Sequence, residues 1–239
     1  MRSSLAFWAA VPLLAPQGLW VRMTAPRFAG AGGEAAGAFG DGPELTFVGF
    51  GDSTVAGVGA RDYAHALVGQ TARYLAERTG RRVRWRAHGI IGANTTRLLD
   101  QHFAHVDFGD ADIVGLSVGV NDVTALTRLE RWRRNLDELF DRINAANPDA
   151  LVVFGGLPPL GEFPLLPQPL RRVLGQRARE LDRVAREVVA AHPQGIYVTC
   201  AFESRPGTFA PDGYHPSEES YAVLGRVTAD AIAARLAGR

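Results

Sequence analysis

The chain has 239 residues, of which 46% are hydrophobic and 21% are charged. This balance is typical of a folded globular protein with a sizeable core and argues against disorder. With 26 basic and 25 acidic residues the formal net charge is only +1, which gives no reason to expect a nucleic acid or an acidic polymer as a partner.

Residues 1–27 differ in character from the rest of the chain. A mostly apolar run from Leu5 to Val21 is preceded by Arg2 and followed by Arg22. This pattern is typical of a secretory signal or a short membrane anchor. Two prolines and a glutamine interrupt the run, so the alternative is a hydrophobic helix that packs on the domain or lies at a membrane surface. We expect the protein to be exported or membrane-associated, with lipid contact through this segment. If the segment has neither role, a cytoplasmic location is expected.

The following stretch, residues 28–43, is rich in Gly and Ala, lacks apolar periodicity and predicts a linker. The folded domain should then span residues 44–239. Within it, short apolar runs alternate with amphipathic stretches at helical spacing. Strands are predicted at 45–50, 83–87, 113–120, 150–154 and 196–202, and helices at 63–78, 95–103, 129–143, 170–191 and 217–236. This order predicts an α/β fold, a three-layer αβα sandwich around a five-stranded parallel sheet.

In such sheets, reacting groups gather on the loops beyond the carboxyl ends of the strands. Four short polar segments lie at such places. They are Gly51-Asp52-Ser53, Gly92-Ala93-Asn94-Thr95, Gly119-Val120-Asn121-Asp122 and, before the last helix, Asp212-Gly213-Tyr214-His215-Pro216.

Taken in this order, the four segments resemble the SGNH hydrolase superfamily, the GDSL lipases and esterases, over residues 44–239. The resemblance implies the flavodoxin-like fold of that superfamily. It also implies a small-molecule ester substrate, such as a lipid, a lysophospholipid or an acetylated sugar, cleaved through an acyl-serine intermediate. Thr54 stands where the name-giving motif has leucine, at a position with no chemical role.

The resemblance also implies the role of each site residue. Ser53 is the nucleophile, His215 the base that activates it, and Asp212 the carboxylate that orients the imidazole. The oxyanion would be bound by the backbone N–H groups of Ser53 and Gly92 and by the side-chain amide of Asn121.

Each of these residues also has a structural interpretation. Ser53 can cap a helix, Asn121 can form a turn, and Asp212 can belong to a turn before a proline. His215 can be a surface histidine or one buried in the core. We interpret Asp52 as structural, bonding nearby backbone.

Two further patterns compete with this assignment. Ser117 lies in a G-x-S-x-G sequence, but that motif requires a sharp strand-to-helix turn at the serine, and the predicted strand continues to Val120. Gly49-Phe50-Gly51 begins like a dinucleotide-binding fingerprint, but Thr54 occupies the place of its third glycine.

No metal or cofactor is expected, because the sequence has no CxxC, HExxH or EF-hand pattern. Its single cysteine, Cys200, cannot form an internal disulfide and lies in an apolar run that predicts a buried strand.

Two other functions remain open at this level. One is acyl transfer from Ser53 to an alcohol, and the other is a non-catalytic, membrane-tethered binding module. Residues 155–169, rich in proline and apolar side chains, follow the fourth strand. Phe163, Leu165 and Leu166 would either form an acyl-binding wall there or pack on the core.

Overall fold

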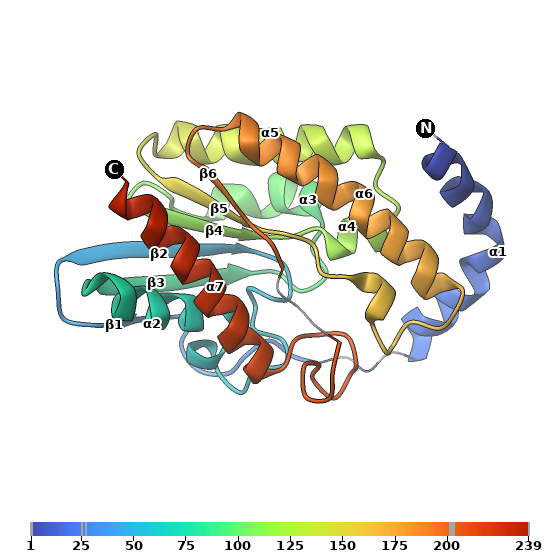
Figure 1. The fold of residues 1–239 in the computed structure, drawn as a ribbon, viewed down its shortest axis with the longest axis horizontal. Coiled ribbons are helices and arrows are strands. Elements are labelled where there is room, and N and C mark those ends of the chain that lie inside the picture. Colours follow the sequence, from blue (N-terminus) through green and yellow to red (C-terminus); the bar gives the residue numbers. More distant parts are fainter. Residues whose placement is uncertain (1, 25, 27, 201–203, 239) are drawn as a thin grey trace.

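The computed structural model describes residues 2–24, 26, 28–200 and 204–238 (Figure 1). In this part of the chain, one sheet has the strand order β1-β3-β2-β4-β5-β6. All neighbouring strands are parallel except β1 and β3. The strands are β1 (Ala36–Phe39), β2 (Glu44–Gly51), β3 (Arg82–Gly89), β4 (Ile113–Ser117), β5 (Leu151–Gly155) and β6 (Gly195–Val198).

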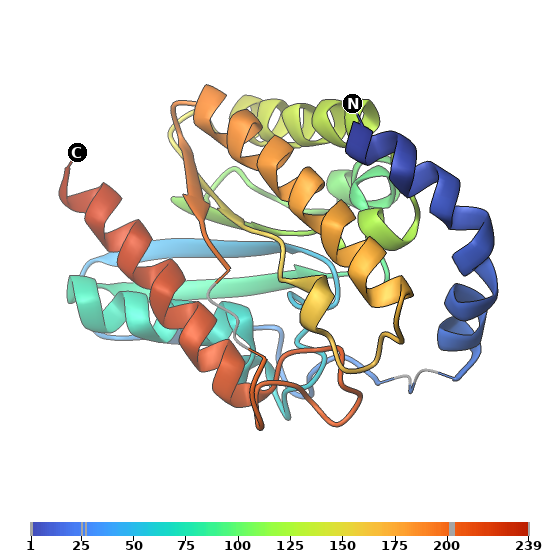
Figure 2. The same cartoon turned by 45° about the vertical axis from the view of Figure 1, so that its right-hand side comes forward.

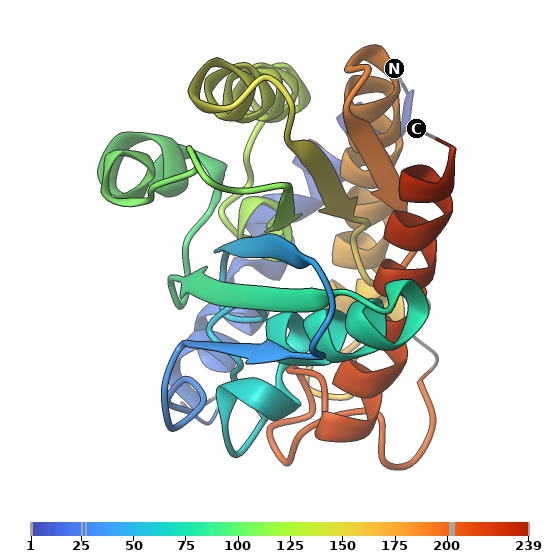
Figure 3. The same cartoon turned by 90° about the vertical axis from the view of Figure 1, so that its left-hand side faces the viewer.

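Helices cover both faces of the sheet and complete a three-layer αβα sandwich, which confirms the predicted fold class (Figures 1 and 3). One face packs against α2 (Leu67–Thr79) and α7 (Glu218–Ala237). The other packs mainly against α5 (Leu129–Ala146) and α6 (Leu170–Ala191). Shorter elements complete the cover: η1 (Tyr63–His65), α3 (Thr95–Arg97), η2 (Leu98–His102), η3 (Phe103–His105), α4 (Val120–Thr124) and η4 (Leu160–Glu162).

The apolar pattern of the sequence explains which segments form the core. β2 and β5 lie in the interior of the sheet and are almost entirely buried, as expected for parallel strands covered on both faces. In α5 the apolar residues recur every three or four positions, and this stripe is the buried face: Trp132, Leu136, Leu139, Phe140 and Ile143.

The sheet has six described strands, where the sequence predicted five. The additional strand, β1, lies in the stretch predicted as a linker and pairs antiparallel with β3 at the sheet edge. Three of its four residues are exposed to solvent, and Phe39 is partly buried. The Phe39 ring stacks on Trp85 with 6.4 Å between the ring centroids. Backbone pairing at an edge needs no apolar pattern, which is why the sequence carries no signal for it.

Two strands end earlier than predicted. β4 ends at Ser117 because the chain turns at Gly119, whose φ of +139° is a conformation that favours glycine, and α4 begins at the next residue. β6 ends at Val198; the predicted strand extended to residue 202, and positions 201 and 202 lie outside the described residues.

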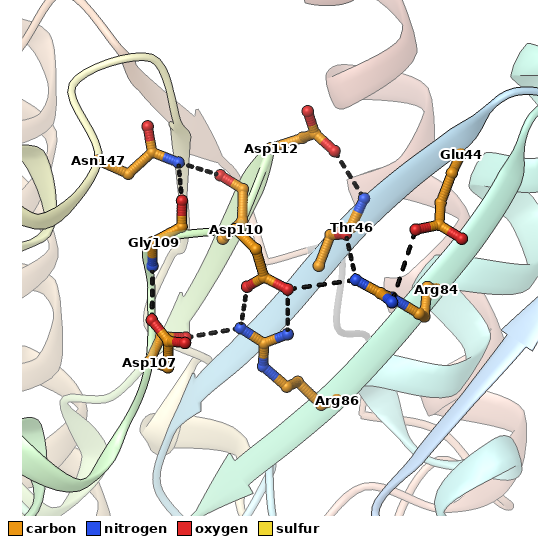
Figure 4. A network of polar contacts seen from close by, with 10 residues as sticks. Glu44, Thr46, Arg84, Arg86, Asp107, Gly109, Asp110, Asp112 and Asn147 are labelled. Carbon is orange, nitrogen blue, oxygen red and sulfur yellow. Dashed lines mark hydrogen bonds and ion pairs between the residues drawn. The ribbon is translucent and has the colours of Figure 1, made fainter.

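An ion-pair network covers the polar face of β3 near the sheet edge (Figure 4). Because side chains alternate along a strand, Val83 and Trp85 face the core under α2 while Arg84 and Arg86 face the opposite side. Both arginines bind Asp110, and Arg86 also donates to the Asp107 carbonyl at 2.6 Å. These partly exposed pairs contribute modest energy, but they fasten the loop before β4 to the sheet.

The N-terminal segment forms a helix, α1 (Arg2–Thr24), that lies beside α6 (Figure 2). Leu14 is buried in the core cluster on that side. Gln17 donates to the Gln168 carbonyl at 3.1 Å and accepts from the Leu170 N–H at 3.2 Å. Of the described helices, none is sufficiently long and apolar to cross a membrane.

Candidate active site

Ser53 lies in the turn that follows β2, at the carboxyl edge of the sheet. The turn closes through backbone hydrogen bonds from Ala56 to Asp52 and from Val58 to Ser53, both 3.0 Å. Asp52 stabilises it by accepting the Thr54 N–H at 3.0 Å, in agreement with the structural role predicted for this carboxylate. Ser53 is 8% exposed, so its hydroxyl lies in a recess.

His215 reaches this hydroxyl from the loop before α7. Its Nε2 lies 3.0 Å from Ser53 Oγ, and its Nδ1 lies 2.6 Å from Asp212 Oδ2. Because an ionised carboxylate can only accept, Nδ1 carries the proton and Nε2 is free to accept one from the serine. The structure thus brings together the three residues that the sequence singled out, in the order that acyl transfer by serine requires.

Hydrogen bonds fix the position and charge of Asp212. Its Oδ1 accepts the backbone N–H groups of Tyr214 and His215, both at 2.9 Å. Burial raises the pKa of this carboxyl, but the bonds from the His215 ring and from the two N–H groups outweigh burial and leave the pKa below its usual value. Asp212 is therefore a carboxylate at neutral pH.

Gly92, after β3, and Asn121, in α4 after β4, lie on either side of the Ser53 turn, because β2 lies between β3 and β4 in the sheet. Gly92 has a φ of +75°, and a side chain there would contact nothing within 4 Å, so its backbone borders open space. Asn121 Nδ2 donates one hydrogen to the Ala93 carbonyl at 2.9 Å, which leaves the second hydrogen of the amide for another acceptor.

Ser117, the competing serine, is the last residue of β4 and not an interior strand residue as predicted. Its hydroxyl lies 2.8 Å from Thr54 Oγ1, which in turn donates to Asp52 Oδ1 at 3.0 Å. Ser117 lines the same cavity as Ser53, but its hydroxyl bonds Thr54, whereas the imidazole of His215 bonds Ser53.

Two buried carboxyl groups flank the site, Asp52 and Asp122, which are 3% and 0% exposed. Burial raises the pKa of each to about 6, against the lowering effect of their hydrogen bonds to Thr54 and Thr95 respectively. Sequence reasoning gave Asp122 no role beyond the motif, because its partner is 27 residues away in the chain.

A cavity of about 100 Å³ opens beside Ser53 and His215. Its walls come from the carboxyl ends of β5 and β6 and from α7, and the lining is mostly apolar. Of the three residues expected to form an acyl wall or pack on the core, Phe163 does both, because it lines the cavity and belongs to the core cluster. Leu166 packs into the core without lining the cavity, and Leu165 donates its N–H to the Gly213 carbonyl. Among the described residues, no cluster of three His, Cys, Asp or Glu side chains is arranged to hold a metal ion.

The chain belongs to the GDSL-like lipase/acylhydrolase family, whose model matches residues 50–223. It is 33% identical over 181 residues to the GDSL-like esterase Rv1075c of Mycobacterium tuberculosis. The aligned region covers 73% of this chain and 57% of that protein. The chain thus spans little more than half the length of this relative.

Solved structures share the fold. A lipase/acylhydrolase from Enterococcus faecalis is similar with a TM-score of 0.58 and 25% identity, covering 80% of this chain and 96% of that one. Est24, a carbohydrate acetylesterase from Sinorhizobium meliloti, is similar with a TM-score of 0.61 and 18% identity. The match covers 80% of this chain and 99% of Est24. The fold agrees with that expected from the four motifs.

The raised pKa of Asp52 predicts a pH-dependent gain in stability on substitution. Since the unfolded carboxyl ionises near pH 4 and the folded one near 6, the wild type loses free energy of unfolding as pH rises through this window, by up to roughly 3 kcal/mol from this group. Asp52→Asn cannot ionise and should lack this loss. Urea unfolding at pH 4, 5, 6 and 7 measures it, and parallel pH curves for the two proteins would contradict the prediction.

Proposed function

We propose that this protein is a serine esterase that hydrolyses carboxylic esters, with Ser53 as nucleophile, His215 as general base and acid, and Asp212 as the orienting carboxylate. The observation that carries the proposal is the continuous hydrogen-bond chain from Ser53 Oγ through the imidazole to Asp212. Membership of the GDSL-like family and the similarity to the mycobacterial esterase support it.

The geometry suits a two-step reaction. Ser53 Oγ attacks the ester carbonyl while its proton passes to His215 Nε2, 3.0 Å away. The carboxylate of Asp212 stabilises the imidazolium that forms. His215 then gives this proton to the leaving alcohol. In the second step water attacks the acyl-serine while His215 takes its proton, and His215 returns the proton to Ser53 Oγ as the acid is released.

The tetrahedral intermediates carry a negative oxygen that needs hydrogen-bond donors. We assign this role to the backbone N–H groups of Ser53 and Gly92 and to the amide of Asn121. Their loops follow three adjacent strands, and the Asn121 amide is held in place by the Ala93 carbonyl. Preorganised donors of this kind typically contribute about 10²–10³ each in turnover.

Replacing Ser53 with alanine should lower hydrolysis of p-nitrophenyl acetate by roughly 10⁴-fold or more, because no other group forms the acyl intermediate. The variant should also resist labelling by a fluorophosphonate, which reacts with activated serines. Ser117→Ala is the matched control and should still be labelled. Activity that survives in Ser53→Ala but disappears in Ser117→Ala would transfer the nucleophile role to Ser117.

We further propose that the cavity beside Ser53 receives the acyl group and favours short chains. Its volume of about 100 Å³ suits a small acyl group. Apolar side chains such as Phe163 and Leu224 line it together with Ser53 and His215.

Filling this cavity should shorten the accepted acyl chain. Gly155 lines it, and a Cβ there would come no closer than 3.9 Å to its neighbours, so Gly155→Val adds a side chain to the cavity wall without a clash at its Cβ. The variant should lower kcat/KM for p-nitrophenyl butyrate about tenfold more than for the acetate. Gly161→Ala, which has room for a Cβ and lies outside the cavity lining, should leave the ratio unchanged. If Gly155→Val changed kcat/KM only between esters that differ in their alcohol part, the cavity would instead hold the leaving group.

We also propose that the carboxyl-terminal end of α1 contacts lipid. Large apolar side chains are exposed there at Leu19, Trp20 and Met23, with exposed fractions of 58%, 57% and 74%. Tryptophan beside aliphatic side chains on a helix surface suits the interface of a bilayer.

Co-sedimentation with phosphatidylcholine vesicles tests this contact. The full chain should bind, and the triple variant Leu19→Ser, Trp20→Ser, Met23→Ser should lose most of that binding because its apolar surface is removed. Ile91→Ser is the control, since Ile91 is also an exposed apolar residue, at 48%, but follows β3 and does not belong to α1, so its loss should leave binding intact. Equal sedimentation of wild type and triple variant would reject the lipid contact.

A further inference from the structure

A buried carboxylate joins the two loops that carry the Gly92 and Asn121 donors. Asp122 is 0% exposed, and both of its oxygens accept from one residue of the other loop. Oδ2 accepts the Thr95 N–H at 2.9 Å and Oδ1 accepts the Thr95 hydroxyl at 2.7 Å. One side chain at the start of α4 thereby fixes both the backbone and the side chain at the start of α3.

The neighbouring residue makes a parallel connection. Asn121 Nδ2 donates to the Ala93 carbonyl at 2.9 Å, so residues 121 and 122 together bind residues 93 and 95. Gly92 directly precedes this bound segment. The Asn121 amide therefore belongs to one hydrogen-bonded connection, and the Gly92 N–H adjoins it, although the two follow different strands.

A third element orients the Thr95 hydroxyl. Asn135, from α5, donates to Thr95 Oγ1 at 2.9 Å and to Thr96 Oγ1 at 3.0 Å. Because Thr95 Oγ1 accepts this hydrogen, its own hydrogen is directed to Asp122 Oδ1. The connection between the loops thus has a defined donor and acceptor at every step.

A purely structural contact at this place would be more stable without a charge. Burial raises the pKa of Asp122 to about 6, so above that pH the fold holds an ionised group away from water, at a cost in stability. An apolar pair could pack the loops together, but the two oxygens of Asp122 accept the N–H and the hydroxyl of Thr95 and so also set the register of one loop against the other.

We propose that Asp122 is a positioning residue that, through Thr95, holds the Gly92 N–H and the Asn121 amide at the spacing required to bind the oxyanion. The inference rests on the proposed function of the site. Asp122 itself lies behind the donors and acts only through them. Removing a hydrogen bond between Asp122 and Thr95 should weaken binding of the tetrahedral transition state while leaving substrate binding nearly unchanged.

Thr95→Val removes the hydroxyl bond to Asp122 at almost constant volume and keeps the backbone N–H, whereas Thr95→Ser keeps both bonds. With p-nitrophenyl acetate, and with active sites counted by fluorophosphonate labelling, Thr95→Val should lower kcat about 10- to 100-fold, less than the loss of a whole donor. KM should change less than threefold. The inhibition constant of a boronic acid, which forms a tetrahedral adduct on the serine, should rise by a similar factor to the loss in kcat. Thr95→Ser should stay within about twofold of wild type in all three.

A merely structural role predicts a different result. It would lower the melting temperature and the labelled fraction, with wild-type kcat per labelled site and wild-type boronic acid affinity, and that result would overturn the proposal. If Thr95→Val does not fold, Asp122→Asn carries the same test, because its amide places a donor where one acceptor stood. Activity retained in Ser53→Ala would reject the proposed function and this inference together, whereas an inactive Ser53→Ala with unchanged Thr95→Val kinetics would reject the inference alone.

Discussion

The hydrogen bond between His215 Nε2 and Ser53 Oγ joins residues 162 positions apart, and the rest of the site is arranged around it. It depends on how the start of α7 packs against the turn that contains Ser53. Tyr221, which is fully buried, donates from its hydroxyl to the Val58 carbonyl at 2.7 Å, and Glu218 accepts the Arg61 N–H at 2.8 Å. These contacts place the segment that carries Asp212 and His215 over the end of β2.

The sheet order supplies the remaining components. Because β2 has β3 on one side and β4 on the other, the loops after these three strands meet at one edge. The Ile90 N–H donates to the Gly51 carbonyl at 2.9 Å, and the Asp52 N–H donates to the Ser117 carbonyl at 3.0 Å, so backbone bonds continue past the strand ends. Ser53 and the segments proposed to donate to the oxyanion are thus held in place by bonds that extend the sheet.

The same arrangement concentrates polar groups where the protein is most buried. Asp52 lies in the turn that contains Ser53 and Asp122 lies in α4, and each is the acceptor for a threonine N–H and hydroxyl. Their raised pKa values show that burial outweighs these bonds. The two buried carboxyl groups therefore lower the stability of the fold while they fix the geometry of their loops, a combination common at functional sites.

The sequence by itself determined the class of fold through its apolar periodicity, because that pattern is a local property of the chain. Its four short motifs, also local, determined the candidate triad and oxyanion donors through their resemblance to a known family. It missed β1, since an edge strand is held by backbone pairing and has no burial pattern. Only the tertiary structure decided where β4 ends, which cavity adjoins Ser53 and that Asp122 binds Thr95. Each of these depends on contacts between residues distant in the chain, whose distances and geometry are set only when the layers pack.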